Sequence, residues 1–279
     1  MQELTGRTAV VTGAASGIGR AVAARFAEEG MRVVLADIER EPLATAVSEL
    51  VEQGHEVLGI PTDVSRWEQV EALAEQSVAR FGAVHVVHNN AGVVVGGPIA
   101  DLSLGDWEWV MGVNLWSVIY GIKAFLPRIR EAGEGHIVNT ASTAGLVSAP
   151  IIAPYNVTKF GVVALTETLE RELAQEGDAI RASVLCPGAI KTRIADAARN
   201  RSDASAAAHR DSPAEKTFLE GARGLLAKGK DPAEVAELVV RGIREQRFWI
   251  LTHPEWKDVL RGRVEALASE DRLSGGFGG

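Results

Sequence analysis

The chain has 279 residues, of which 46% are hydrophobic and 24% charged, and its formal net charge at pH 7 is −8. This composition is typical of a globular protein with enough apolar side chains to form a core. The acidic balance argues against nucleic acid as a partner, because binding phosphates requires a concentrated basic surface. Cys186 is the only cysteine, which excludes an intrachain disulfide and a cysteine-based zinc site, so we expect no metal.

The sequence also bears on where the protein works. Residues 1–4 show no basic segment followed by an apolar stretch, so we expect no signal peptide. No uninterrupted apolar run approaches the roughly 18 residues that are needed to cross a bilayer. A lone cysteine fits a reducing compartment. The sequence therefore predicts a cytoplasmic protein that binds no membrane.

Short apolar runs alternate with amphipathic stretches along the chain. Residues 7–12 predict a buried strand, and Ile18, Val22 and Phe26 then recur at the spacing of one helix face. Further strands are predicted over 32–36, 57–60, 84–87, 137–140, 182–185 and 248–252, and helices over 42–52 and around 256–267. Alternating strands and helices indicate βαβ units. Strands that are apolar throughout are typical of a sheet covered on both faces. We predict an α/β fold with a Rossmann-like doubly wound parallel sheet, in a single domain over 1–279.

Two regions break this rhythm. Residues 193–230 are rich in Ala, Arg and Ser and show little apolar periodicity. We predict a mobile substrate flap there, with a solvated loop as the alternative. Residues 271–279 are rich in glycine and are predicted to form a flexible tail.

A glycine-rich segment, Thr12-Gly13-Ala14-Ala15-Ser16-Gly17-Ile18-Gly19, joins the first predicted strand to the first helix. Its glycines allow a tight turn and close approach of the backbone to a ligand. The helix N-terminus that follows offers N–H groups and a positive dipole end to a pyrophosphate. The spacing differs from the G-x-G-x-x-G of the usual dinucleotide fingerprint. A glycine turn that only packs helix on strand is the alternative.

Asp37 ends the second predicted strand, about 18 residues after Gly19. A carboxylate at this point can accept hydrogen bonds from both ribose hydroxyls of an adenosine. It would also repel a 2′-phosphate, so we predict NAD rather than NADP as the cofactor. Arg40 nearby argues the other way, and an aspartate that merely caps a turn is the alternative.

Tyr155 and Lys159 are four residues apart, a spacing that puts both on one face of a helix. A nearby ammonium lowers the pKa of a tyrosine, which suits general acid–base catalysis. The same spacing also arises by chance between inert surface neighbours. Ser142, just past a predicted strand, can hydrogen-bond a substrate oxygen or serve as a turn residue. Asn114 is a polar residue on an apolar helix face, and a satisfied structural amide is its alternative role.

Together these residues resemble the short-chain dehydrogenase/reductase family over roughly residues 5–195. The resemblance rests on the loop 12–19, on Asn89-Asn90-Ala91-Gly92, on the four residues Asn114, Ser142, Tyr155 and Lys159, and on Pro187-Gly188. It implies that those four residues are catalytic. It implies cofactor contacts from Gly13, Ser16, Gly17, Ile18, Gly19, Asp37, Asp63, Val64, Asn90, Ala91, Gly92, Tyr155, Lys159, Pro187, Gly188, Ile190 and Thr192. Two departures are Ala141, where a second serine is frequent, and His88, which we expect to be buried and hydrogen bonded.

The resemblance implies a mechanism for the oxidation of an alcohol. Tyr155 as phenolate takes the hydroxyl proton, Ser142 holds the substrate oxygen, and hydride passes to the nicotinamide. Lys159 lowers the pKa of Tyr155 and binds the nicotinamide ribose, and Asn114 holds a water that links Lys159 to solvent. Apolar residues within 93–99 and 144–152 predict a hydrophobic secondary alcohol or ketone as the substrate.

Other functions stay open at this point. An NADP-dependent carbonyl reductase is the alternative within the family, and a nucleotide-sugar epimerase or dehydratase is a more distant one. A non-catalytic dinucleotide sensor would be expected to lose the tyrosine or the lysine, whereas this chain has both. Because the family is commonly oligomeric, we expect a homodimer or a homotetramer.

Overall fold

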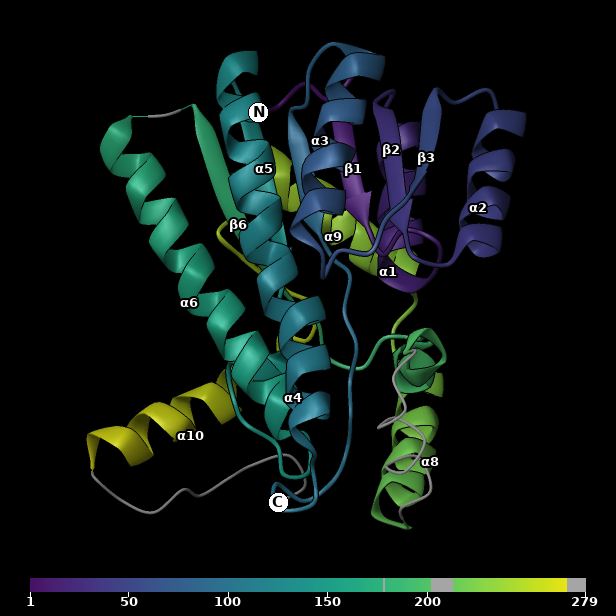
Figure 1. The fold of residues 1–279 in the computed structure, drawn as a ribbon. Helices are drawn as coiled ribbons and strands as arrows, with labels where there is room; N and C mark the ends of the chain where they lie inside the picture. Colours follow the sequence, from purple (N-terminus) through teal and green to yellow (C-terminus); the bar gives the residue numbers. More distant parts are fainter. Residues whose placement is uncertain (178, 202–212, 270–279) are drawn as a thin grey trace.

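The computed structural model describes residues 1–177, 179–201 and 213–269. Within these ranges the chain forms one seven-stranded sheet of order β3-β2-β1-β4-β5-β6-β7 (Figure 1). Every pair of neighbouring strands is parallel. The strands are β1 (Thr8–Thr12), β2 (Arg32–Asp37), β3 (Val57–Pro61), β4 (Val86–Asn89), β5 (Gly135–Thr140), β6 (Ile180–Cys186) and β7 (Trp249–Leu251).

Helices cover both faces of the sheet (Figure 1). On one face Phe26, Leu43 and Val239 join the core cluster of α1 (Gly17–Glu28), α2 (Arg40–Glu52) and α9 (Pro232–Arg244). On the other, Leu73, Phe125 and Leu173 do so for α3 (Trp67–Phe81), α5 (Ser117–Ala132) and α6 (Ala153–Glu176). The remaining helical elements are α4 (Leu104–Met111), η1 (Gly112–Trp116), η2 (Thr143–Gly145), η3 (Ile194–Asn200), α8 (Pro213–Ala227) and α10 (Trp256–Ala268). The predicted doubly wound α/β fold is therefore confirmed.

The segment predicted as a substrate flap contains more regular structure than its sequence indicated. Residues 194–200 form a 3-10 helix and residues 213–227 form α8. Phe218 of α8 packs directly on the backbone of Gly96, where even a β-carbon would come within 2.0 Å of the phenyl ring. α8 therefore packs on a loop rather than on the sheet. Because this contact needs few apolar side chains, residues 193–230 show little apolar periodicity in the sequence. Residues 202–212 and the predicted tail 271–279 lie outside the described residues.

Residues 104–132 form one continuous run of helix through α4, η1 and α5. Within the described residues it is the one helix whose length and composition would suffice to cross a membrane. Its side chains Val110, Val118 and Phe125 are buried in the protein core, and Lys123 and Arg128 interrupt its apolar character. These contacts are those of a core helix that covers a sheet.

The order of the strands creates a crevice. β1 pairs with β2 on one side and with β4 on the other, so the chain winds outward in opposite directions from this point. The loops that follow β1 and β4 consequently diverge at the carboxyl ends of the strands. Open α/β sheets bind ligands at such a switch point.

Candidate active site

A cleft of about 440 Å³ lies at the carboxyl ends of the strands. It brings together residues that follow each of the strands β1 to β6. Among its lining residues are the predicted Gly13, Ser16, Gly17, Ile18, Asp37, Asp63, Val64, Asn90, Ala91, Gly92, Ser142, Tyr155, Lys159, Pro187, Gly188, Ile190 and Thr192. Two predicted residues, Gly19 and Asn114, do not line the cleft and instead support it from behind.

The glycine loop is shaped for a close backbone approach. Gly13 and Gly17 have φ angles of +65° and +55°, a region that favours glycine. A β-carbon on Gly13 would lie 2.9 Å from the Cα atom of Ala91, and one on Gly19 would lie 2.2 Å from the carbonyl oxygen of Gly13. The loop therefore packs as a glycine turn, the alternative considered above, and at the same time lines the cleft.

The N-terminus of α1 also suits an anion. Its N-cap residue Ser16 makes no side-chain capping hydrogen bond, and the first turn contains no acidic residue. By contrast α4 and α9 both begin with complete capping boxes. Within the described residues, the first N–H groups of α1 thus have no side-chain acceptor, and they lie beside the cleft, an arrangement that fits the diphosphate of a dinucleotide.

Asp37 ends β2 at the rim of the same cleft and is 8% exposed. Its Oδ2 atom accepts a hydrogen bond from the N–H of Ala15 at 2.9 Å, and Oδ1 accepts one from the N–H of Glu39 at 3.0 Å. Burial raises the pKa of this carboxyl, and the two N–H donors oppose that rise. Asp37 thus caps a turn, as the alternative held, and also presents its carboxylate to the cleft.

Tyr155 and Lys159 lie in the first two turns of α6. The Nζ atom of Lys159 donates a hydrogen bond to the carbonyl oxygen of Thr140 at 2.8 Å and lies 5.5 Å from the centre of the Tyr155 ring. Burial lowers the pKa of Lys159 to about 8. Burial also raises the pKa of Tyr155, while a hydrogen bond with the Ser142 side chain opposes the rise. The predicted direction for Tyr155 was therefore wrong, because desolvation of the phenolate outweighs its favourable contacts.

Ser142 follows β5 and is the N-cap of η2. Its hydroxyl accepts a hydrogen bond from the N–H of Ala144 at 3.1 Å and donates one to the carbonyl oxygen of Pro187 at 3.3 Å. The turn role is thus real, and it fixes the hydroxyl beside Tyr155 in the wall of the cleft. Both proposed roles of this serine are compatible with one position.

Asn114 lies in η1, a π-helical turn between α4 and α5. Its Oδ1 atom accepts a hydrogen bond from the N–H of Val93 at 2.8 Å. Its Nδ2 atom donates to the carbonyl oxygen of Val93 at 2.9 Å and to the hydroxyl of Thr158 at 3.3 Å. The side chain is therefore the satisfied amide of the alternative interpretation. π-helical turns are frequent at functional sites. Through the hydrogen bonds of Asn114, this turn links the loop after β4 to α6.

His88, the departure noted in β4, is fully buried. Its Nε2 atom lies 2.8 Å from the hydroxyl of Thr140. Its Nδ1 atom has no hydrogen-bond partner within the described part of the chain, so the prediction of a fully hydrogen-bonded histidine holds for one ring nitrogen only. Burial lowers its pKa to about 3, and the ring is neutral at physiological pH.

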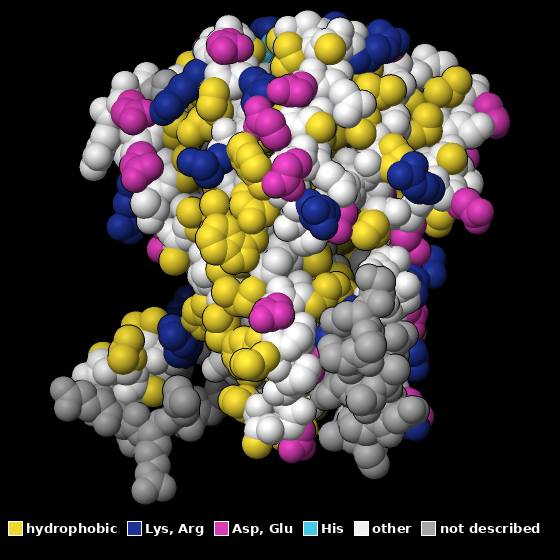
Figure 2. Space-filling view, in the orientation of Figure 1, with side chains coloured by type: hydrophobic (Ala, Val, Ile, Leu, Met, Phe, Trp, Pro, Cys, Tyr) yellow, Lys and Arg dark blue, Asp and Glu magenta, His cyan; other side chains and the backbone are white. Residues whose placement is uncertain are grey.

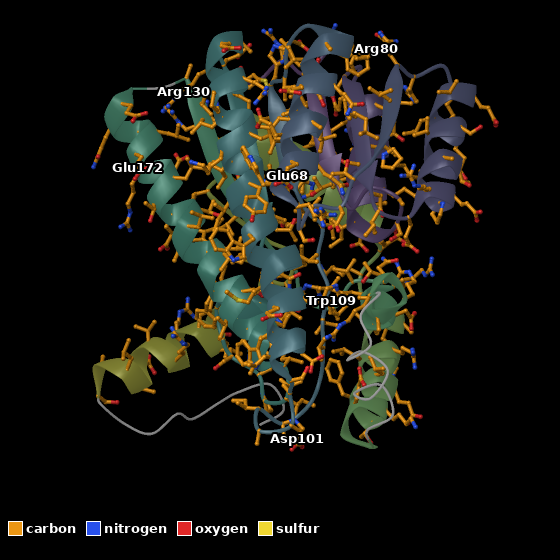
Figure 3. All side chains as sticks on the ribbon, viewed as in Figure 1. Glu68, Arg80, Asp101, Trp109, Arg130 and Glu172 are labelled. Atoms are coloured by element: carbon orange, nitrogen blue, oxygen red, sulfur yellow. The ribbon has the colours of Figure 1, made fainter. Side chains whose placement is uncertain are left out.

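Several lining residues were not singled out from the sequence, and six of them lie in residues 193–201, within the segment predicted as a substrate flap. Arg193, Arg199 and Arg201 supply cations that the segments 93–99 and 144–152 lack. The other missed residues are Ile38, Glu39, Thr62, Ser65, Trp109, Val113, Ile194, Ala197, Asn200 and Leu226. Trp109 projects from α4 on the side that faces α8 (Figure 3). Only a spatial contact identifies these residues, since none belongs to a recognisable motif.

Arg201, one of the lining residues, forms a buried ion pair with Asp106, and the two side chains are 4% and 0% exposed. Asp106 also closes the capping box of α4 with Ser103. The guanidinium carbon of Arg201 lies 5.2 Å from the centre of the Trp109 ring, within the range of a cation–π contact. Removing one partner of a buried pair costs about 3–5 kcal/mol, so this pair holds residue 201 firmly to α4.

Residues 7–203 match the family described as short chain dehydrogenase, and the chain belongs to the short-chain dehydrogenase/reductase family of enzymes. It is 31% identical to a CLA biosynthesis dehydrogenase/reductase of Lactiplantibacillus plantarum, over 97% of this chain and 96% of the relative. It is 39% identical to 3beta-hydroxysteroid dehydrogenase 2 of Eggerthella lenta, over 72% and 77%. A crystal structure of a family member from Burkholderia phymatum in complex with NAD is 41% identical, covers 98% of both chains and superposes with a TM-score of 0.94.

Proposed function

We propose that this enzyme is an NAD(H)-dependent oxidoreductase that interconverts a hydrophobic secondary alcohol and its ketone, with Tyr155 as the general acid/base. The observation that carries the proposal is the shared cleft. Tyr155, Ser142 and Lys159 lie in the wall of the same cleft that the glycine loop and Asp37 line. A phenol, a hydroxyl donor and an ammonium beside a dinucleotide site are the groups that hydride transfer needs.

In the oxidation direction, the Tyr155 phenolate takes the proton of the substrate hydroxyl. The Ser142 oxygen is held by the N–H of Ala144. Its single proton, which points to the carbonyl oxygen of Pro187 here, would turn to the substrate oxygen and steady the negative charge that develops there. A bound nicotinamide would supply the hydride acceptor. Lys159 favours the phenolate while its ammonium is charged. Asn114 acts as a positioning residue that fixes the backbone of Val93 and, through Thr158, the start of α6.

Three observations support NAD rather than NADP. The carboxylate of Asp37 faces the cleft, where a 2′-phosphate would meet negative charge. Arg40, which argued for NADP in the sequence, is exposed and is not among the lining residues, whereas Arg199 lines the cleft but is paired with Glu39. The related structure from Burkholderia phymatum, 41% identical, holds NAD.

Apolar side chains in the lining of the cleft support an apolar substrate. Val93, Trp109, Val113 and Leu226 line it, and the charge of Arg201, another lining residue, is neutralised by Asp106. One relative is named as a hydroxysteroid dehydrogenase, which supports a bulky alcohol.

We further propose a cytoplasmic homodimer or homotetramer that binds neither membrane nor nucleic acid. A band of hydrophobic side chains covers the face that carries α4 and α5 (Figure 2), and Trp116, next to α5, is 47% exposed.

The test compares the wild type with Tyr155→Phe. We expect the wild type to turn over members of a panel of hydrophobic secondary alcohols with a higher kcat/KM for NAD than for NADP. Tyr155→Phe should abolish turnover and leave NADH binding, followed by nicotinamide fluorescence, almost unchanged. Near-normal kcat in this variant would falsify the role of Tyr155. A higher kcat/KM with NADPH and ketones would favour the carbonyl reductase, and binding without turnover of any substrate would favour the sensor.

A further inference from the structure

Residues on opposite sides of the crevice are joined by a fork-shaped ion pair. The Nε and Nη2 atoms of Arg199 donate hydrogen bonds to the two carboxylate oxygens of Glu39, at 2.8 and 2.6 Å. Arg199 lies in η3, after β6, and Glu39 lies two residues beyond the end of β2. β1, β4 and β5 separate these two strands in the sheet, so the pair spans the switch point between β1 and β4, from the loop after β2 to the segment after β6.

The guanidinium of Arg199 is held in this position by its own turn. Its Nη1 atom donates hydrogen bonds to the carbonyl oxygens of Asp196 at 2.9 Å and of Arg193 at 3.3 Å. All its nitrogens are thus engaged, and the planar fork is pre-organised for a carboxylate. Glu39 and Arg199 both line the cleft, next to the carboxylate of Asp37, which we assign to the adenosine ribose.

Two side chains near the C-terminal end of residues 194–201 are held with different strength. The Arg201–Asp106 pair is almost fully buried, with side chains 4% and 0% exposed. The side chains of Arg199 and Glu39 are 26% and 16% exposed, so solvent weakens their attraction and can solvate both partners when they separate. The segment is therefore anchored on α4 and can be released at Glu39.

We propose that the Glu39–Arg199 pair is a clasp that holds residues 194–201 across the adenosine half of the bound dinucleotide and thereby sets how long the cofactor stays. The inference rests on the proposed function, since it takes NAD(H) as the ligand of the cleft. Glu39 and Arg199 are positioning residues in it: they hold one wall of the cleft against the other. Opening the clasp exposes the adenosine end and leaves the catalytic end at Tyr155 in place.

The test measures the rate of NADH release by stopped-flow fluorescence, with the full chain in every case. Glu39→Gln and Arg199→Gln should each accelerate release about fivefold or more, the size expected for a coupled pair of this kind. The double variant should release NADH no faster than either single variant, and the charge reversal E39R/R199E should restore slower release. The kcat of an enzyme limited by cofactor release should rise in the single variants while the KM for NAD also rises.

Arg244→Gln is the matched control. Arg244 also donates to both carboxylate oxygens of a glutamate, Glu29, through Nη1 and Nη2, and neither residue lines the cleft. Its loss should leave NADH release unchanged. Wild-type release rates in both single variants would overturn the clasp, as would an equal acceleration in Arg244→Gln. A wild-type protein that binds no NADH would instead overturn the proposed function, so the two failures are distinguishable.

Discussion

The Nζ atom of Lys159 lies 2.8 Å from the main-chain carbonyl oxygen of Thr140, so the lysine of α6 is hydrogen bonded to the carboxyl end of β5. This lysine is 2% exposed. Burial lowers its pKa to about 8, and burial also raises the pKa of the neighbouring Tyr155. Desolvation, rather than a neighbouring charge, therefore dominates the acid–base properties of this pair.

The first prediction concerns the pH dependence of catalysis. Because the pKa of Tyr155 is raised, its phenol is protonated at neutral pH and the phenolate accumulates only as the pH increases. The kcat/KM for alcohol oxidation should therefore rise from neutral into alkaline pH. Ketone reduction uses the protonated phenol and should be retained throughout the neutral range. Initial rates in both directions against pH check this, and an oxidation profile that falls above neutral pH would contradict it.

The sequence predicts the fold well because the information is local. Apolar runs such as 7–12 and 182–185 and the glycine loop mark where strands end, and the carboxyl ends of parallel strands must meet at one edge. The residues that the sequence does not reveal depend on distant contacts. Arg199 meets Glu39 across 160 positions of the chain, and no local pattern announces that partner.

The properties of individual site residues are also beyond the sequence. Whether Lys159 lowers the pKa of Tyr155 depends on how deeply both are buried, which the four-residue spacing does not specify. Asn114 is polar on an apolar helix face, but only its distances to Val93 show that a backbone amide uses both ends of the side chain. The pattern identifies such residues as unusual, and the geometry decides what they do.

The second prediction concerns Asn114. Asn114→Ala leaves the buried N–H of Val93 without its acceptor, at a cost of about 1–3 kcal/mol. For a chain of this size each kcal/mol lowers the Tm by about 2–4 °C. We expect a lower Tm measured by circular dichroism and a lower kcat, because Val93 lines the cleft.

Asn114→Asp is the informative partner of that variant. It keeps an oxygen that can accept from the N–H of Val93, and when protonated it offers one O–H donor in place of the two N–H donors that serve the Val93 carbonyl and Thr158. Its Tm should therefore lie between those of Asn114→Ala and the wild type at a pH where the new carboxyl is protonated. An Asn114→Ala variant with wild-type Tm and kcat would show that the amide does not hold this loop.

The third prediction separates steric from conformational effects at Gly19. This residue has no positive φ, so its backbone accepts alanine, but the added β-carbon would lie 2.2 Å from the carbonyl oxygen of Gly13 and 2.6 Å from Nδ2 of Asn90. The glycine loop and α1 must then move apart, at a cost of about 1–3 kcal/mol for overpacking. Gly19→Ala should lower the Tm and weaken NADH binding at least tenfold.

Gly262→Ala is the control, because Gly262 lies within α10 and, in the part of the chain that the structure describes, no atom outside its own helix backbone and chain neighbours comes within 4 Å of its added β-carbon. Alanine favours a helix by up to about 1 kcal/mol over glycine, so this control should keep or raise the Tm and leave NADH affinity unchanged. Wild-type NADH affinity in Gly19→Ala, measured by fluorescence titration, would mean that the loop does not have to fit the cofactor closely.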